Sequence, residues 1–418
     1  MISTYDDCMT KSDLAVNYRK IRSETERICS LLQPDDYQVQ SIIETSPPKW
    51  HLAHVSWFFE SFVLSVFTQA YHPFHPKFSY LFNSYYETVG KMQPRPQRGM
   101  LSRPTVEEIY YYRAYVDEHM LNLIDEIEVE KWQAFAFSVV LGLNHEQQHQ
   151  ELLFMDIKHN LSVNPLKPAY SDKLTAAVVE AKEMGWIEQT GGLADIGHSG
   201  VGFAYDNETP RHQVLVQDHK LATRPVNNEE YLAFIEDDGY LRADLWLSDG
   251  WAAVKQGGWQ HPLYWQKIDN NWYQYTLGGM RKLNFSEPVC HVSFYEANAY
   301  ASWSGKRLPI EAELELMLAS QPLEGNFTDH NMLHPRAGHG QWYGDVWEWC
   351  ATPYGPYPGF KPLEGSVGEY NGKFMCNQMV LRGGCCVTPE SHIRASYRNF
   401  FYPHDRWAFT GIRLAENL

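Results

Sequence analysis

Hydrophobic residues recur at intervals of three and four positions through most of the first 160 residues. This pattern covers residues 12–32, 47–69, 105–127 and 129–159, and each segment predicts an amphipathic helix. Thr105, followed by Glu107 and Glu108, is typical of a capped helix start. Four helices of this length favour a four-helix bundle.

The pattern changes in two places. Residues 71–101 are rich in Tyr, Pro and Gly and show no periodicity, which predicts a long loop with a functional role. Beyond residue 191, short apolar runs alternate with glycines, tryptophans and turn residues. They predict short strands, interrupted by two short helices over 227–237 and 294–303.

These patterns predict three parts. Residues 11–160 form a helical bundle, residues 161–190 a linker, and residues 191–418 an α+β domain. A polar helix is expected over 171–184, within the linker. A chain of 418 residues is too long for a single ordinary core, which agrees with a multidomain protein.

Composition narrows the class of partner. The chain has 51 acidic and 35 basic residues, a net charge of −16, and such a surface repels nucleic acid. No apolar stretch is long and uninterrupted enough to span a membrane, and the polar N-terminus does not resemble a signal peptide. Seven cysteines without a CxxC pair favour a reducing compartment. We therefore expect a cytoplasmic protein that binds neither nucleic acid nor a membrane.

A metal site is indicated on the last predicted helix. His145 and His149 are four residues apart, so both imidazoles share one face of the helix. Two histidines at this spacing often lie on a solvated face, and a third ligand is needed. His51 and His54, on the second predicted helix, are both candidates. Three neutral imidazoles suit zinc and ferrous iron equally well.

The same segment also matches the H-E-x-x-H helix of zinc peptidases, with Glu146 as general base. The extended form of that motif requires glycine and histidine where this chain has Leu152 and Met155. A helical bundle also lacks the strand that lines a peptidase cleft. A peptidase therefore stays a minor alternative.

The 71–101 loop carries a second group of candidates. Arg95 and Arg98 are three residues apart and could hold a carboxylate bidentately. Tyr85 and Tyr86 could donate a proton beside a metal. The alternative is an ordinary packed loop in which these side chains anchor the loop to the bundle.

Several short sequence motifs, taken together, resemble those of a known family. GKRLPIEAE, GDVWEW and LRGG resemble the formylglycine-generating-enzyme (sulfatase-modifying-factor, C-type-lectin-like) fold, and the first half resembles a DinB-like four-helix bundle with a three-histidine metal site. With WHLAH, HEQQH, NSYYE, RPQRG and the run over 397–401, the chain resembles the iron-dependent sulfoxide synthases of ergothioneine biosynthesis.

The resemblance implies a role for individual residues. Fe(II) would be held by His54, His145 and His149, with His51 as a neighbour. Gln148 and Asn399 would contact hercynine, which is N-α-trimethylhistidine. Arg95 and Arg98 would hold the carboxylate of the sulfur donor, and Tyr85 or Tyr86 would supply a proton beside the iron.

The resemblance also implies a reaction. The cysteine sulfur would be joined to C2 of the hercynine imidazole with O2, giving hercynylcysteine sulfoxide. Members that use γ-glutamylcysteine have an acid where this chain has Phe401, so free cysteine is the expected donor. The copper-binding cysteines of formylglycine generators are missing, and the second domain is expected to form half of the pocket instead. A selenoneine or ovothiol-type synthase and a non-catalytic metal-binding module are the alternatives.

Overall fold

The computed structural model describes residues 9–174, 180–338 and 342–418. The chain folds into two compact units. Unit 1 comprises Met1–Leu166, Gly200–Phe203 and Pro362–Tyr370, and unit 2 comprises Lys167–Ser199, Ala204–Lys361 and Asn371–Leu418. Unit 1 thus includes a short segment from the last quarter of the chain.

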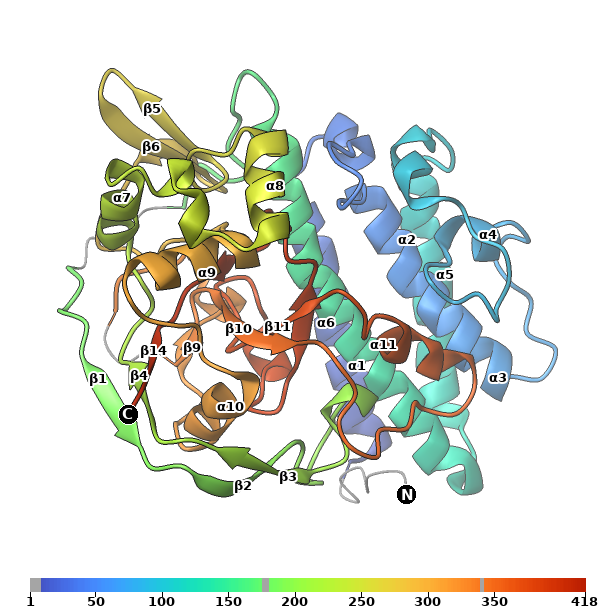
Figure 1. Ribbon diagram of the computed structural model, residues 1–418. Helices are drawn as coiled ribbons and strands as arrows, with labels where there is room; N and C mark the ends of the chain where they lie inside the picture. The colour runs from blue at the N-terminus through green and yellow to red at the C-terminus, as the bar shows by residue number, and fades with distance from the viewer. Residues whose placement is uncertain (1–8, 175–179, 339–341) are drawn as a thin grey trace. The chain divides into compact units, whose positions relative to one another are not determined.

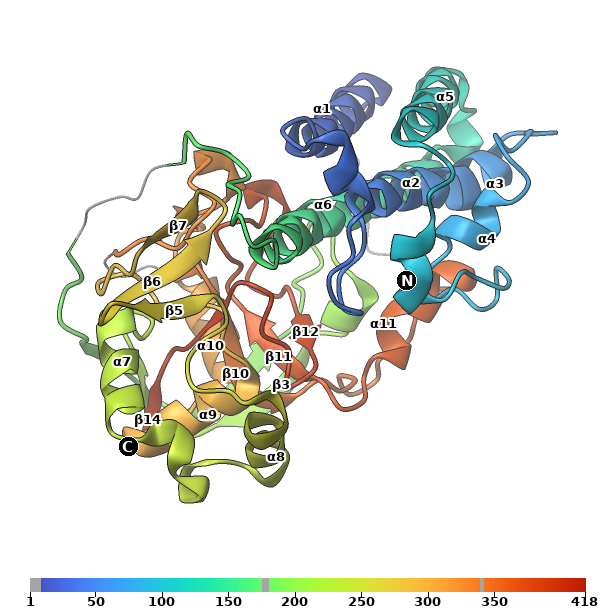
Figure 2. The same ribbon diagram turned by 90° about the horizontal axis from the view of Figure 1, so that it is seen from above.

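Unit 1 is built on the predicted four-helix bundle, which is confirmed. Its long helices are α1 (Lys11–Cys29), α2 (Pro48–Phe59), α5 (Val106–Glu126) and α6 (Trp132–Ser162). Helices α1 and α2 each pack against both α5 and α6 (Figures 1 and 2). Leu14, Leu52, Val116 and Phe154 are among the buried residues that form the core between them.

The helix ends follow from local sequence. The side chain of Thr10 caps α1 in a reciprocal pair with Asp13, and Thr105 caps α5 in the same way with Glu108. Each pair satisfies backbone N–H groups that have no partner within the helix. The predicted start of the third long helix is therefore confirmed. Two short 3-10 turns, η1 (Pro34–Gln38) and η4 (Val129–Lys131), complete the connections.

The second bundle helix changes its winding beyond Phe59. A π-helical turn, η2 (Glu60–Leu64), follows α2 and leads into the short α3 (Ser65–Phe67). The buried carboxylate of Glu60 accepts hydrogen bonds from the Tyr71 hydroxyl at 2.9 Å, the Phe74 N–H at 3.0 Å and the Tyr112 hydroxyl at 2.7 Å. These bonds attach the start of the 71–101 loop to the bundle. Within that loop only α4 (Phe78–Phe82) and the 3-10 turn η3 (Arg95–Met100) are regular.

Unit 2 has the predicted α+β character, with small sheets in place of one large one. The sheets are β1–β4–β14, β12–β11–β10–β13, β2–β3, β5–β6–β7 and β8–β9. Trp347 and Trp349 on β10 are fully buried at the centre of this unit. The strands are β1 (Trp186–Gln189), β2 (Gly192–Ile196), β3 (His212–Val216), β4 (His219–Ala222), β5 (Trp265–Ile268), β6 (Asn271–Thr276), β7 (Gly279–Lys282), β8 (Gly325–Asn326), β9 (Tyr343–Gly344), β10 (Trp347–Pro353), β11 (Met379–Arg382), β12 (Asn399–Phe401), β13 (Thr410–Gly411) and β14 (Ala415–Asn417).

The helices of the second half are partly as predicted. Helices α7 (Asn228–Glu236) and α9 (Phe294–Trp303) are confirmed, whereas α8 (Ser248–Gly257), α10 (Glu311–Ala319) and α11 (Glu369–Lys373) were not expected. The helix predicted over 171–184 is wrong for residues 171–174 and 180–184, and residues 175–179 lie outside the described residues. Short isolated helices are marginal in water, so a polar pattern of this length is a weak signal for a helix. None of the helices in the described part of the chain is long and apolar enough to cross a membrane.

Candidate metal centre

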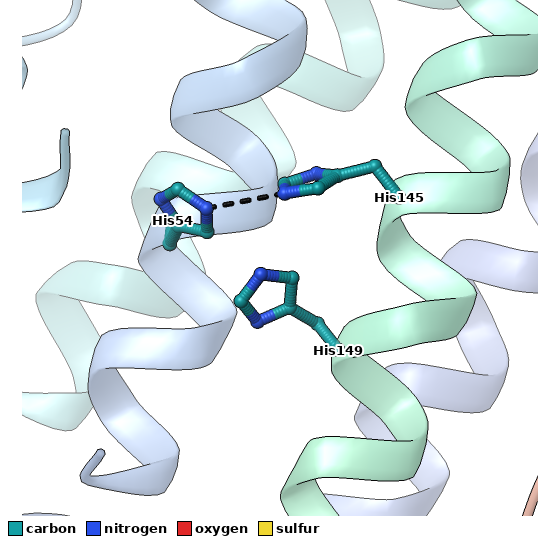
Figure 3. Close-up of side chains that lie close together, drawn as sticks. All are labelled: His54, His145 and His149. Atoms are coloured by element: carbon teal, nitrogen blue, oxygen red, sulfur yellow. Dashed lines mark hydrogen bonds between the residues drawn. The ribbon is translucent and has the colours of Figure 1, made fainter. Parts of the chain in front are cut away.

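Three buried histidines of unit 1 converge on one point. His54 projects from α2, and His145 and His149 project from α6 (Figure 3). One ring nitrogen of each lies within 4.8 Å of the others. The spacing of four residues places the two α6 histidines on the same face, as the sequence predicts, and His54 supplies the third nitrogen.

A glycine allows α2 and α6 to approach each other beside this cluster. A Cβ atom added to Gly142 of α6 would lie 2.6 Å from Cε1 of Phe59 and 3.2 Å from Cδ1 of Phe58. Glycine inside a helix costs about 1 kcal/mol relative to alanine. The close approach of the two helices offsets this cost, and the Phe58 ring stacks on His145 at 4.5 Å.

Hydrogen bonds fix how two of the histidine rings are oriented. Nδ1 of His54 lies 2.6 Å from the carbonyl oxygen of Phe82. A carbonyl only accepts, so Nδ1 carries the proton and Nε2 of the neutral ring is bare. Nδ1 of His149 lies 2.7 Å from Nδ1 of His51. Nε2 of His145 lies 3.2 Å from Nε2 of His54, and Nδ1 of His145 has no hydrogen-bond partner among the described residues.

The surroundings keep these rings uncharged. Burial lowers the pKa of His145 to about 3 and lowers the pKa of His54 and His149 well below the ordinary value. Trp50 stacks on His54 at 4.5 Å and Trp57 lies on it at 5.4 Å. Neutral imidazoles in a dry aromatic setting are the form in which histidine binds a transition metal. The three residues therefore fit a divalent metal ion such as Fe(II) or Zn(II).

Arg98 provides a buried positive charge in the same unit. Its guanidinium donates to the hydroxyls of Ser46 at 3.0 Å and Ser84 at 2.8 Å, and it stacks 3.5 Å from the centre of the Trp50 ring. Among the described residues no carboxylate pairs with Arg98, and its Nε has no hydrogen-bond partner. Burial, reinforced by the charge of Arg95, lowers the pKa of Arg98 to about 9. A buried guanidinium without a counter-ion is suited to bind an anionic ligand.

Arg95 is bound differently from Arg98. Its guanidinium donates to the backbone carbonyls of Ile43 and Glu44 and to the hydroxyl of Tyr85. Tyr85 has a left-handed backbone with φ of 68°, which is uncommon for a residue with a side chain and typical of functional sites. Tyr86 is instead buried against Phe62 and Trp57, with ring centres 5.0 Å and 5.8 Å apart. The two adjacent tyrosines thus have different surroundings.

Two residues of the 362–370 segment contact the tyrosine loop and were not foreseen. The carboxylate of Glu369 accepts the N–H groups of Glu87 at 3.0 Å and Thr88 at 3.2 Å, and the Thr88 hydroxyl at 2.9 Å. The ring of Tyr370 lies 6.1 Å from that of Tyr85. The contacting residues are about 280 positions apart in the chain, so no local pattern could reveal the contact.

The other predicted site residues lie in different places. Gln148 lies on α6 between the two histidines and is partly buried. Asn399 and Phe401 both lie on β12 of unit 2, and Asn399 accepts a hydrogen bond from the N–H of Phe400 at 2.9 Å. Their roles stay predictions.

Glu146 does not have the surroundings of a peptidase general base. Its carboxylate is fully buried and pairs with Arg22 at 2.9 Å and with Arg113 at 3.2 Å. The Thr25 hydroxyl also donates to it at 2.6 Å. A carboxylate neutralised by two guanidinium groups is a poor base for water activation, which argues against the zinc peptidase.

The bundle, the histidine cluster and the second unit define a two-part class of protein. The sequence pattern of the DinB superfamily matches residues 17–153, and that of the sulfatase-modifying factor enzyme 1-like domain matches residues 172–341 and 334–418. Among solved structures, PvdO from Pseudomonas aeruginosa aligns with a TM-score of 0.37 and 19% identity, covering 56% of this chain and 94% of PvdO.

Curated relatives narrow the class to one family. The hercynine oxygenase of Mycolicibacterium smegmatis is 30% identical over 340 residues, covering 72% of this chain and 77% of the relative. That of Mycobacterium tuberculosis is 30% identical over 314 residues, covering 68% of this chain and 72% of the relative. This chain belongs to the hercynine oxygenase family and is an enzyme.

Proposed function

We propose that this enzyme is a non-haem iron(II)-dependent sulfoxide synthase of ergothioneine biosynthesis. It would join the sulfur of cysteine to C2 of the hercynine imidazole with O2 and release hercynylcysteine sulfoxide. The observation that carries the proposal is the cluster of three neutral, buried histidines in a unit that also buries Arg98, a guanidinium with no carboxylate partner among the described residues.

The metal ligands in this proposal are His54, His145 and His149. Three ligands of this kind leave coordination positions open for substrates. Fe(II) bound there would supply a Lewis-acidic and redox-active centre at which a thiol loses its proton and O2 is reduced. The protein's part is to keep the rings neutral, which the buried aromatic surroundings of Trp50, Trp57 and Phe58 support.

Arg98 would bind the carboxylate of the sulfur donor. Its partners in this structure are neutral hydroxyls and a tryptophan face, so its charge is available for an incoming anion. A charge-assisted bond formed in a buried place is stronger than one in water. Arg95, whose N–H groups are engaged by backbone carbonyls and by Tyr85, would orient Tyr85 and secure the loop.

Tyr85 would be the proton donor of the tyrosine pair. Arg95 donates to its phenol oxygen, which fixes the position of the hydroxyl. Tyr86 is packed between aromatic rings and would form a wall of the site. Gln148 and Asn399 would contact hercynine, and the apolar side chain of Phe401 agrees with free cysteine as the donor.

The test is an aerobic reaction with Fe(II), hercynine and cysteine, followed by mass spectrometry. Parallel reactions replace cysteine with γ-glutamylcysteine or a selenosugar, and hercynine with histidine. A hercynine–cysteine sulfoxide adduct that forms only with Fe(II) and O2 would support the proposal. An adduct with another pair would overturn the assigned substrates, and no adduct with any pair in iron-loaded protein would overturn the reaction.

A further inference from the structure

A chain of two hydrogen bonds ends on one of the proposed metal ligands. Nδ1 of His149 lies 2.7 Å from Nδ1 of His51, and Nε2 of His51 lies 2.9 Å from Oδ2 of Asp156. His51 comes from α2 and Asp156 from α6, two turns beyond His149. His51 and Asp156 are each 2% exposed, so water does not compete for these bonds.

Asp156 sets the direction of the protons along this chain. Its Oδ2 also accepts the backbone N–H of Ser46 at 2.8 Å, so this oxygen acts as a hydrogen-bond acceptor. Nε2 of His51 must therefore carry a proton, and Nδ1 of the neutral His51 ring is left as an acceptor. His149 then donates from its own Nδ1, and its Nε2 is bare.

We infer that His51 and Asp156 are positioning residues for His149, an inference that rests on the proposed metal site. By holding the Nδ1 proton of His149, they keep the other ring nitrogen deprotonated and fix the plane of the ring. Partners of this kind raise the basicity of a ligating imidazole, and their loss typically costs 10–100-fold in metal affinity. His54 receives the equivalent support from the Phe82 carbonyl.

His51 is thereby given a role different from that of His54, three residues later. Both residues lie on one face of α2, and the sequence alone does not show which of them is the metal ligand. Both ring nitrogens of His51 are in hydrogen bonds, whereas Nε2 of His54 is directed at the other two histidines (Figure 3).

The test measures metal binding without turnover. The apoprotein is titrated with Co(II) against a chelator, and the d–d absorption spectrum reports the ligand field. His51→Phe keeps a ring of similar shape but removes the acceptor, so we expect a 10–100-fold weaker affinity for Co(II) and an altered spectrum. His51→Gln keeps an amide oxygen and an N–H group, and should restore at least part of the affinity. The control is His392→Phe, which removes a buried histidine of unit 2 bonded to Tyr397.

A double-mutant cycle separates positioning from a general loss of stability. Asp156 acts on the metal only through His51 in this inference, so His51→Phe combined with Asp156→Ala should lose no more affinity than His51→Phe alone. Full additivity would overturn the inference, as would a His51→Phe protein that binds Co(II) within twofold of the wild type. If His51→Phe does not fold, Asp156→Ala is compared with His51→Gln. Asp156→Ala should then weaken the affinity for Co(II), and His51→Gln should keep at least part of it. Wild-type protein that binds no Co(II) would instead overturn the proposed metal site.

Discussion

Two buried arginines, Arg98 of unit 1 and Arg382 of unit 2, have opposite surroundings. In unit 1, Arg98 is 3% exposed, and its partners in the described part of the chain are hydroxyls and an aromatic face, beside histidines that are held neutral. In unit 2, Arg382 is fully buried and donates to Glu311 and Glu315, both at 2.6 Å. Arg398 adds a second guanidinium on Glu311 at 2.7 Å.

The difference agrees with the proposed role of Arg98 in ligand binding and with a structural role for the cluster around Arg382. Although burial alone would raise the pKa of Glu311, Arg382 and Arg398 hold that pKa below its ordinary value. Both carboxylates of that cluster have a guanidinium partner, and the ion pairs link α10 to strand β11 and to Arg398, the residue before β12. Arg98 and the bare histidine nitrogens are incomplete in the protein alone. Polar groups that stay buried without full partners cost stability, and such groups persist where a ligand completes them.

The largest effect expected from this comparison is the loss of a metal ligand. His145→Ala should remove metal binding and lower turnover by at least about 100-fold, because two imidazoles do not retain a catalytic ion. The far-UV circular dichroism spectrum should be preserved. Iron content after reconstitution and product formation by mass spectrometry are the measurements. His392→Ala, in unit 2, should leave both unchanged, and iron retained at full stoichiometry in His145→Ala would contradict the site.

The next prediction contrasts two buried arginines. Arg382→Met leaves Glu311 and Glu315 with an uncompensated buried charge, so the free energy of unfolding should fall by about 3–5 kcal/mol. Arg98→Met strands no carboxylate and should change stability by less than about 1 kcal/mol. It should nevertheless raise KM for the sulfur donor by about 100-fold. Denaturant unfolding measures the free energy of unfolding of both variants, and steady-state kinetics measure KM. Equal destabilisation by the two substitutions would contradict the difference drawn between Arg98 and Arg382.

A smaller effect is expected where the two metal-bearing helices touch. Gly142→Ala improves helix propensity by about 1 kcal/mol but places a methyl group 2.6 Å from the Phe59 ring. The phenyl rings on α2 cannot move without disturbing His145, so we expect a net destabilisation of about 1–3 kcal/mol. A weaker affinity for Co(II) should accompany it. The control is Gly355→Ala, which adds the same methyl group at a position where a Cβ has no atom within 4 Å. Gly257→Ala is unsuitable because its Cβ would contact Trp259.

The fold of unit 1 was predictable because its signals are local. Periodic apolar residues and capping pairs such as Thr105 with Glu108 lie within a few positions of each other, and the pair His145 and His149 needs only one helix. In contrast, the helix predicted over 171–184 depended on packing that the pattern cannot report. Helix α10 begins at Glu311, within the motif GKRLPIEAE, where the sequence showed a motif but no helical period.

The surroundings of individual site residues could be distinguished only in the structure. Arg95 and Arg98 look alike in the sequence, yet Arg95 donates to backbone carbonyls whereas Arg98 donates to serine hydroxyls. The bond from His51 to Asp156 joins residues 105 positions apart, and Glu369 contacts the tyrosine loop from still further along the chain. Pairwise contacts over such separations are fixed by the tertiary fold, which short motifs do not encode.

One carboxylate is an exception to the pairing in unit 2. Asp345 is 1% exposed, and its Oδ1 accepts the Asn326 amide at 2.7 Å and the Arg336 N–H at 2.9 Å. Within the described ranges, its Oδ2 has no hydrogen-bond partner. Burial raises the pKa of Asp345 from 3.8 to about 7, so the folded protein binds a proton that the unfolded chain has already released.

Stability should therefore fall as the pH rises through 7. In the unfolded state Asp345 is ionised at both pH 6 and pH 8, whereas in the folded state it goes from mostly protonated to mostly ionised. With a folded pKa of about 7, this change costs about 1.4 kcal/mol. Asp345→Asn keeps the acceptor oxygen without the charge. The difference in free energy of unfolding between wild type and variant should therefore change by about 1.4 kcal/mol between pH 6 and pH 8. Denaturant unfolding at pH 6 and pH 8 measures it, and a difference that does not change with pH would show that Asp345 is ionised and paired like the other buried carboxylates of this unit.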